Sequence, residues 1–547
     1  MTKKIKRLAM VALAIVMAFT LTLGMTGCGG GTSTSGNYLR VGWCSEPDIM
    51  NPLTSYSTES KQITGLVYET LMTYDADMNE IPALAKSYDY SNGNKTVTFH
   101  LVDNATWHDG EPFTADDVVC TYKIIKDYGI SECVQYVDPL TDIKAIDDYT
   151  VEMTFSEPQA YSPAFVVPIL PKHIWGEMDA AEIEAFANET PIGTGPYKFT
   201  SWEEGSTAQI DRNEEYHGEA PGPDGVIYIL YGNEDVAVQA LAAGEVDILT
   251  EVSATLFETL KDQENIVAAD LPSYSFHYLG FNMSTKDSSK GNKMVLDLPV
   301  RQALAHCINK DKMVELCLSG YGEPGTSVLP PGFADWKYDF SDDEIIGYDL
   351  DEAKSILDNA GYTDSDGDGI RDKDGEPMSF RLFCDEAYSA DVRAAELFKD
   401  ECKKIGVEIT LSTYDENTLG DIVYDTEATD FDITIWGWDA DYPDPSYMLG
   451  ITLTSQIGNN NEVYYSNPEY DALYDQQAQL IDKGERKAVI NEMEKMLYND
   501  CAFNMLWYQN KLQAYRTDRF EGWQDAAGGM IFSPTYVNYT NIQPIQQ

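Results

Sequence analysis

The sequence predicts a multidomain protein of mixed α/β or α+β class. Its 547 residues are too many for a single hydrophobic core, so two or three domains are expected. The hydrophobic share of 43% and the charged share of 23% are typical of globular proteins. Strand-like and helix-like periodicities also alternate along the whole chain. These observations favour several folded lobes.

Strands are predicted where apolar and polar residues alternate. Residues 96–101 (T-V-T-F-H-L) and 151–155 show this period, and residues 227–231 form a short apolar run. Asp109 and Gly110 predict a turn between the first two.

Helices are predicted from capping residues and from apolar residues at helical spacing. Thr114 can cap a helix through Asp117 three residues on. Further helices are expected over residues 236–243, 299–308, 351–360, 390–405 and 486–498. Pro299 suits the first turn of its helix, and Gly361 suits a helix end.

The first 27 residues predict a targeting segment. Basic residues at 3–7 precede an apolar stretch at 8–23, and the sequence M-T-G-C at 25–28 closes it. Small residues before a cysteine resemble a bacterial lipobox, which implies that Cys28 is lipidated. A plain signal peptide is the alternative.

The body of the protein is expected outside the cytoplasm, anchored to the outer face of the membrane. Residues 29–37 are rich in Gly, Ser and Thr and predict a flexible tether. No later run reaches the ~18 apolar residues that a spanning helix needs. Disulfides are permitted there, but the sequence assigns no pairing among the eight cysteines after Cys28.

The charge balance restricts the ligand class. The chain has 37 basic and 91 acidic residues, a formal net charge of −54. Such a surface repels nucleic acid and anionic headgroups, so nucleic-acid binding is excluded. Cationic or zwitterionic ligands fit this field better.

Residues 431–445 (F-D-I-T-I-W-G-W-D-A-D-Y-P-D-P) are the first candidate site. The alternation at 431–435 predicts a strand with one buried face. Gly437 permits close approach to the backbone, and Trp436 and Trp438 flank it with aromatic surface. Aspartates follow, which suits an extended ligand with a positive charge. The alternative is a structural strand that runs into an acidic turn.

Residues 364–375 (D-S-D-G-D-G-I-R-D-K-D-G) are a second candidate site, for Ca²⁺. Oxygen ligands at alternate positions with a glycine for the turn suit this ion. The match to an EF-hand is partial, since Gly375 occupies the twelfth position. The expected ligands are the side chains of Asp364, Asp366, Asp368 and Asp372 and the carbonyl of Ile370.

Catalytic patterns are absent from the sequence. The six histidines show no H-E-x-x-H spacing, and neither a G-x-S-x-G elbow nor a P-loop occurs. This favours a binding protein over an exported hydrolase. A tethered adhesin is the other alternative.

Several ordered motifs resemble the extracytoplasmic solute-binding proteins of ABC importers, in particular family 5, the oligopeptide, dipeptide and nickel group. They cover nearly everything after Cys28 and include Y-E-T-L at 68–71, W-H-D-G-E-P-F-T-A-D-D-V at 107–118, G-T-G-P-Y-K-F at 193–199, A-L-A-A-G-E-V-D at 240–247 and V-R-Q-A-L-A at 300–305. Each motif alone is weak, but their common order is specific.

The resemblance implies a periplasmic-binding-protein-like α/β fold of the class II (cluster C) type. Two lobes joined by a two-stranded hinge close on the ligand, and an inserted domain extends one of them. Lobe I is expected from residues 38–80, 195–282 and 512–547, the inserted domain from 81–194 and lobe III from 283–511.

The resemblance also implies a monomeric receptor that captures peptides, mainly oligopeptides, and delivers them to ABC permease and ATPase subunits. It requires no cofactor, and Ca²⁺ would be structural. Capture of an oligosaccharide or a nickel chelate by the same fold is the alternative.

Peptide-binding members carry a G-W-x-A-D-Y motif, which this chain matches with Gly437, Trp438, Ala440, Asp441 and Tyr442, and with Asp439 at the variable position. The resemblance assigns to Asp441 the peptide's α-ammonium, which a carboxylate holds by charge-assisted hydrogen bonds. Backbone groups at 437–439 are expected to pair with the ligand main chain. Neither Ile435 nor Trp436 offers a cation for a peptide carboxylate, so longer peptides or an uncharged ligand stacked on the tryptophans remain open.

Overall fold

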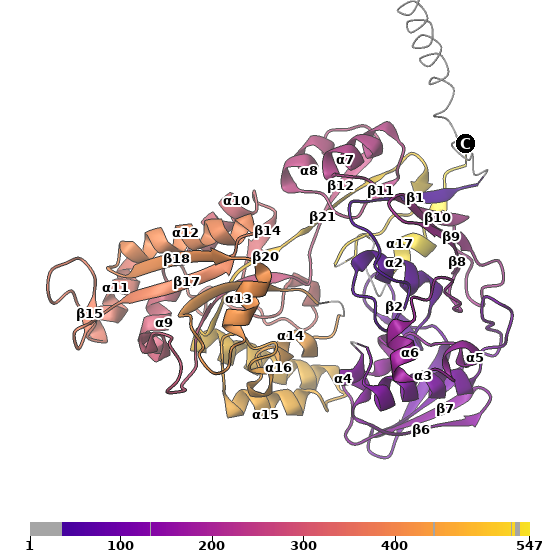
Figure 1. The fold of residues 1–547 in the computed structure, drawn as a ribbon, viewed down its shortest axis with the longest axis horizontal. Helices are drawn as coiled ribbons and strands as arrows, with labels where there is room; N and C mark the ends of the chain where they lie inside the picture. Colours follow the sequence, from indigo (N-terminus) through magenta and orange to yellow (C-terminus); the bar gives the residue numbers. More distant parts are fainter. Residues whose placement is uncertain (1–35, 132, 441–442, 527, 531–535, 547) are drawn as a thin grey trace, which may run out of the picture. The chain divides into compact units, whose positions relative to one another are not determined.

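The computed structural model describes residues 36–131, 133–440, 443–526, 528–530 and 536–546 (Figure 1). Residues 39–547 form one compact unit. The predicted targeting segment, Cys28, Asp441 and Tyr442 lie outside the described residues. In the part of the chain that is described, no helix is long and apolar enough to span a membrane.

A seven-stranded mixed sheet combines the beginning and the end of the chain. In spatial order its strands are β12 (Ile266–Leu271), β21 (Lys511–Arg516), β11 (Ile248–Leu249), β1 (Tyr38–Trp43), β10 (Gly225–Leu230), β9 (Thr207–Arg212) and β8 (Tyr197–Glu203). β1 pairs in parallel with β11, and β21 lies antiparallel between β12 and β11. The associated helices are α2 (Thr58–Val67), α7 (Glu234–Ala243), α8 (Ala254–Leu260) and α17 (Val537–Thr540).

A four-stranded antiparallel sheet is formed by β4 (Ala85–Ser91), β5 (Thr96–Leu101), β7 (Thr150–Phe155) and β6 (Leu140–Asp147). Helix α3 (Ala115–Tyr128) packs against it, followed by the short helices α4 (Val134–Val137), α5 (Lys172–Trp175) and α6 (Ala180–Ala185). The predicted cap of α3 is confirmed, since the Thr114 amide donates to Asp117 Oδ2 at 2.8 Å.

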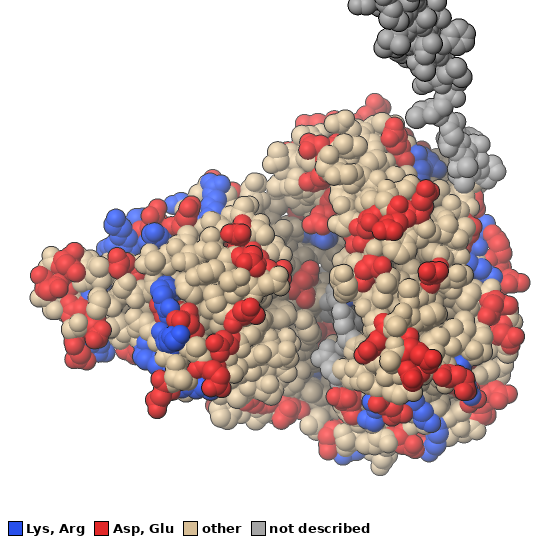
Figure 2. All heavy atoms as spheres, in the orientation of Figure 1, with Lys and Arg blue, Asp and Glu red and all other residues tan. Residues whose placement is uncertain are grey.

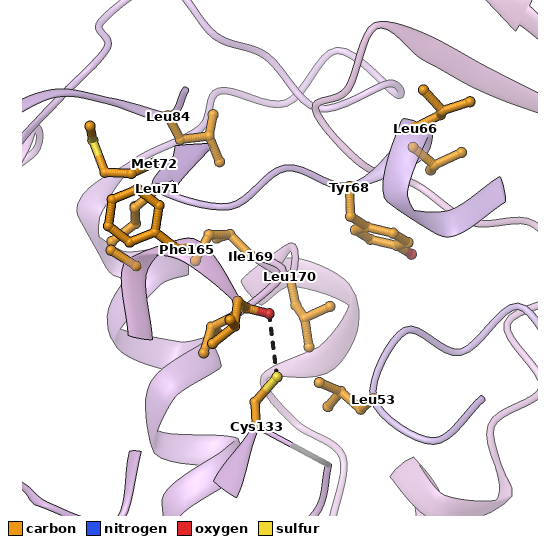
Figure 3. Close-up of a cluster of buried hydrophobic side chains, with 14 of the residues drawn as sticks. Leu53, Leu66, Tyr68, Leu71, Met72, Leu84, Cys133, Phe165, Ile169 and Leu170 are labelled. Atoms are coloured by element: carbon orange, nitrogen blue, oxygen red, sulfur yellow. Dashed lines mark hydrogen bonds between the residues drawn. The ribbon is translucent and has the colours of Figure 1, made fainter. Parts of the chain in front are cut away.

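One apolar core joins this sheet to α2 and to the loops between them. Figure 3 shows part of it, with Phe165 beside Leu71, and with Leu53, Leu66, Tyr68 and Leu170 in the same cluster. The Cys133 thiol donates to the Val166 carbonyl at 3.3 Å within this core. All eight described cysteines are free in the structure.

A six-stranded mixed sheet is formed by β14 (Gly322–Pro324), β20 (Phe503–Gln509), β13 (Phe276–Phe281), β19 (Ile433–Trp438), β17 (Ser379–Asp385) and β18 (Glu408–Tyr414). Two large cores lie against it, and a smaller one is formed by Phe383, Leu419, Val423, Phe431 and Tyr464. One involves α9 (Leu298–Ala305), α10 (Lys310–Cys317), α11 (Leu350–Asn359) and α12 (Ser389–Lys403). The other involves α14 (Ser446–Gly450), α15 (Pro468–Gln477) and α16 (Lys483–Asp500).

The chain passes twice between the seven-stranded and the six-stranded sheet, from β12 to β13 and from β20 to β21. The two connections are bonded to each other. The Asn510 side chain donates to Asp270 Oδ1 at 2.7 Å, and the Ser273 hydroxyl donates to the Gln509 carbonyl. This is the pair of connections that the predicted fold class requires.

Local predictions agree well with the observed elements. The strand at 96–101 coincides with β5, and the helices at 351–360, 390–405 and 486–498 correspond to α11, α12 and α16. Gly361 follows α11 with φ of 84°, the left-handed conformation expected of a glycine at a helix end.

Candidate ligand-binding cavity

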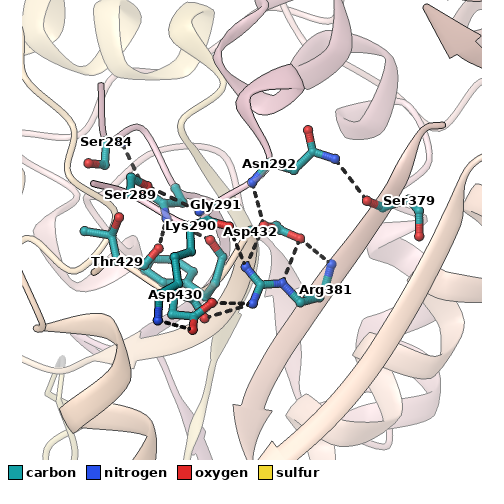
Figure 4. A network of polar contacts seen from close by, with 12 residues as sticks. Ser284, Ser289, Lys290, Gly291, Asn292, Ser379, Arg381, Thr429, Asp430 and Asp432 are labelled. Carbon is teal, nitrogen blue, oxygen red and sulfur yellow. Dashed lines mark hydrogen bonds and ion pairs between the residues drawn. The ribbon is translucent and has the colours of Figure 1, made fainter. Parts of the chain in front are cut away.

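The segment that leads into β19 is anchored by a network of charged groups around the buried Asp432 (Figure 4). Asp432 Oδ2 accepts from the Arg381 backbone at 2.7 Å and from its Nε at 3.2 Å. Asp432 Oδ1 accepts from the Asn292 backbone at 2.7 Å, and Asp430 binds the same guanidinium. The prediction of one buried face is wrong here, because Asp432 and Thr434 are also buried.

The second half of β19 is more open. Trp436 and Trp438 are half-buried and pack on the core of α14–α16. The Trp438 indole donates to Glu462 Oε1 at 3.0 Å, and the Tyr278 hydroxyl donates to the same oxygen. Glu462 is fully buried, and burial raises the pKa of its carboxyl to about 7.

A neighbouring side chain leaves no room for a Cβ at position 437, which explains the glycine there. It lies opposite His277 on β13, and a Cβ at this position would lie 2.9 Å from the imidazole ring. The ring cannot easily move, since it stacks on Trp507 with centroids 5.6 Å apart and its Nδ1 lies 2.8 Å from Asp391 Oδ1. The close approach predicted at Gly437 is therefore made by His277.

One edge of β19 lacks a strand partner towards its end. β13 pairs with the whole strand from Ile433 to Trp438. β17 pairs only with Ile433 and Thr434. Beyond Thr434, no described strand pairs with this second edge, so backbone groups there have no ladder partner from a sheet.

A cavity of about 710 Å³ reaches the residues that follow β19. Asp439, which is exposed, and Ala440, which is buried, line it there. The rest of the wall comes from α2 and from loops far apart in sequence, including Ser45, Glu59, Gln62, Glu69, Tyr74, Cys133, Phe165, Glu251, Tyr274, Lys511 and Tyr536.

The charged groups on the cavity wall are mainly acidic. Lys61 and Lys511 are the lysines among the lining residues, whereas the carboxylates are Glu59, Glu69, Asp75, Glu219, Glu251 and Asp439. Acidic side chains are also spread widely over the face of the molecule in Figure 2. No histidine lines the cavity, although all six are within the described residues.

Two of these acids differ sharply in their surroundings. Glu69 is buried and accepts from His217 Nε2 at 2.9 Å and from the Tyr216 hydroxyl at 2.9 Å. This contact raises the pKa of His217 despite its burial. The pKa of Glu59 is raised by burial and by the charge of Glu251, and Lys511 offsets part of this.

The predicted binding segment reaches the cavity only in part. Asp439 lines it, together with Ala440, whereas Trp436, Gly437 and Trp438 are not among the lining residues. Asp441 and Tyr442 are outside the described residues. Sequence reasoning missed Glu59, Glu69 and Glu251, because no local pattern links these three positions.

The acidic loop at 364–375 brings together three of its five predicted Ca²⁺ ligands. Carboxylate oxygens of Asp364, Asp366 and Asp368 all lie within 4.8 Å of one another, and all three residues are exposed. Asp372 instead accepts from the backbone and hydroxyl of Ser365. Ca²⁺ binding at this loop stays a prediction.

Comparison with known proteins defines the class. The model of the bacterial extracellular solute-binding proteins, family 5, matches residues 79–460. The chain therefore belongs to this family of receptors.

Individual relatives are similar in sequence to this chain over most of their length. Oligopeptide-binding protein AppA of Bacillus subtilis is 29% identical over 545 residues, covering 95% of this chain and 97% of the relative. The dipeptide-binding protein of Escherichia coli is 24% identical, covering 84% and 87%.

Solved structures share the fold. The Bacillus subtilis AppA structure, in complex with a nonapeptide, has a TM-score of 0.72 at 27% identity, covering 93% of this chain and 99% of the other. A periplasmic oligopeptide-binding protein of Thermotoga maritima has a TM-score of 0.79 at 23% identity, covering 93% and 99%. The predicted fold class is confirmed.

Proposed function

We propose that this chain is the substrate-binding receptor of an ABC importer and captures peptides, mainly oligopeptides. The observation that carries the proposal is the cavity of about 710 Å³ that meets the end of β19. Pockets of ~300–1,000 Å³ are typical of small-ligand sites. The Bacillus subtilis relative is an oligopeptide-binding protein and the Escherichia coli relative a dipeptide-binding protein, which supports peptides as the ligand class.

The peptide main chain would extend the sheet at the edge of β19 that no described strand pairs with beyond Thr434. Main-chain hydrogen bonds give affinity without selecting side chains, which suits a receptor for peptides of many sequences. Asp439 and Ala440 would then lie where the peptide enters the cavity.

Asp441 would hold the α-ammonium of the peptide. It directly follows Ala440, a residue of the cavity wall. An ammonium group that is removed from water needs a charged partner, and a carboxylate supplies short hydrogen bonds to it.

The remaining roles follow from this proposal. The receptor would perform no chemistry on its ligand and would deliver it to a permease with ATPase subunits. A lipid on Cys28 would retain it at the outer face of the membrane. Metabolic labelling with a fatty acid tests the anchor, since Cys28→Ala should remove the label.

The ligand class can be tested directly. The protein would be purified without denaturation, and the ligands it retains would be released by acid and identified by mass spectrometry. Peptides are the expected result, with micromolar or tighter affinity when they are titrated back into the emptied protein.

Two other outcomes would replace the proposal. Retention of glycans alone would indicate an oligosaccharide receptor. Retention of a nickel complex would indicate chelate capture, for which a cavity wall without histidine offers no direct protein ligand of that kind.

A further inference from the structure

We propose that the cavity selects its peptides by charge and favours those with lysine or arginine side chains over neutral or acidic ones. This inference rests on the proposed function and specifies its substrate class. It concerns side chains of the ligand, not the α-ammonium assigned to Asp441.

The first support is the composition of the wall. Six acidic residues and two lysines line a partly open cavity of about 710 Å³. A cleft lined by one sign of charge focuses the field inside it, because its walls have a low dielectric constant. A cationic side chain is therefore attracted, whereas an acidic one is repelled.

The second support is the state of the individual acids. Glu69 is bound by His217 and Tyr216, so its charge is already compensated. Glu59 and Glu251 differ from it, since neither has an ion-pair or side-chain hydrogen-bond partner among the described residues. Both line the cavity, Glu59 from the first turn of α2 and Glu251 from the segment after β11.

The third support is that these two acids act on each other. Burial raises the pKa of Glu59 most, and the like charge of Glu251 raises it further, a repulsion that Lys511 offsets only in part. An ammonium or guanidinium group placed near both carboxylates would remove this repulsion. The ligand would thereby supply the positive charge that the wall lacks.

The experiment compares matched pentapeptides in the emptied full-length protein by isothermal titration calorimetry. Each peptide is alanine except for one lysine, glutamine or glutamate, placed in turn at the second, third or fourth position. The charge-removing variant is Glu59→Gln with Glu251→Gln. The matched control is Glu184→Gln with Glu396→Gln, two exposed acids that do not line the cavity.

Lysine peptides are expected to bind about tenfold more tightly than glutamine peptides at the best position, because the lysine ammonium would meet two partly exposed carboxylates. The cavity variant should lose this preference and keep its affinity for the glutamine peptide, which also shows that it is folded. The control variant should keep the preference, and added salt should weaken it.

Equal affinity for all three peptide types, or tighter binding of glutamate peptides, would overturn charge selection and leave peptide capture intact. A lysine preference that survives in the cavity variant would equally overturn the assignment to Glu59 and Glu251. If none of the peptides bound, the proposed function itself would fail.

Discussion

The two ends of β19 are built for different purposes. Directly before its first residue, Asp432 is 3% exposed and is bonded to Arg381 and Asn292. Towards its end, the indoles are half-buried, one backbone edge is paired with no strand of the described part of the chain, and the chain continues into the wall of a cavity. The chain is thus held by ion pairs directly before β19, whereas one edge near the end of β19 has backbone groups that no described strand pairs with.

The largest expected effect comes from removing the Asp432 carboxylate. Asp432→Ala removes a buried carboxylate that binds the Arg381 guanidinium and two backbone amides. Urea unfolding should show a loss of about 2–4 kcal/mol, because two backbone amides would lose their charged acceptor while the partly exposed Arg381 keeps Asp430. Asp430→Ala, at a more exposed residue of the same network, should cost much less. Equal losses would contradict the view that Asp432 is the anchor.

A pH series tests the buried carboxyl group of Glu462, which accepts hydrogen bonds from Trp438 and Tyr278. Because burial raises the pKa of Glu462 to about 7, the folded state binds this proton more tightly than the unfolded state. Stability should therefore fall as pH rises from about 4.5 to 7, by about 2–3 kcal/mol from this group.

Glu462→Gln should remove that part of the slope and make the protein more stable than wild type above pH 7. Part of the slope should remain, since burial also raises the pKa of Glu494 to about 7. An unchanged pH dependence would show that Glu462 is ionised in the folded protein.

Gly437→Ala tests the packing in the second half of β19. The added methyl would meet the His277 ring at 2.9 Å, and the ring is held by Trp507 and Asp391. Chemical unfolding should show a loss of about 1–3 kcal/mol from overpacking. His277→Ala in the same background should recover part of this loss relative to His277→Ala alone. No rescue would mean that the glycine serves the ligand and not the histidine.

The smallest effect concerns the acidic loop at 364–375, which lies outside the cavity wall. Calcium at about ten times its dissociation constant should stabilise the protein by about 1.4 kcal/mol, seen as a higher Tm. Asp366→Asn should abolish the shift without altering peptide affinity. A peptide affinity that depends on Ca²⁺ would contradict a purely structural role.

Much of the fold could be predicted because local periodicity reports burial. The strand at 96–101 and the helix around 486–498 were found from spacing alone. The environment of Asp432 could not be predicted, because the alternation of apolar and polar residues puts it on a solvent-exposed face. In the structure Asp432 is buried and binds Arg381, which is distant in the sequence. The cavity wall was missed for the same reason. Glu59 and Glu251 are brought to one cavity only by the folded chain.

The most direct test of the central proposal compares a peptide with a free amino terminus and its N-acetylated form. Wild-type protein is predicted to bind the free form at least about tenfold more tightly, as expected for a desolvated charge pair. Asp441→Asn should lose this difference and bind both forms alike. An undiminished preference for the free amine in Asp441→Asn would contradict the account.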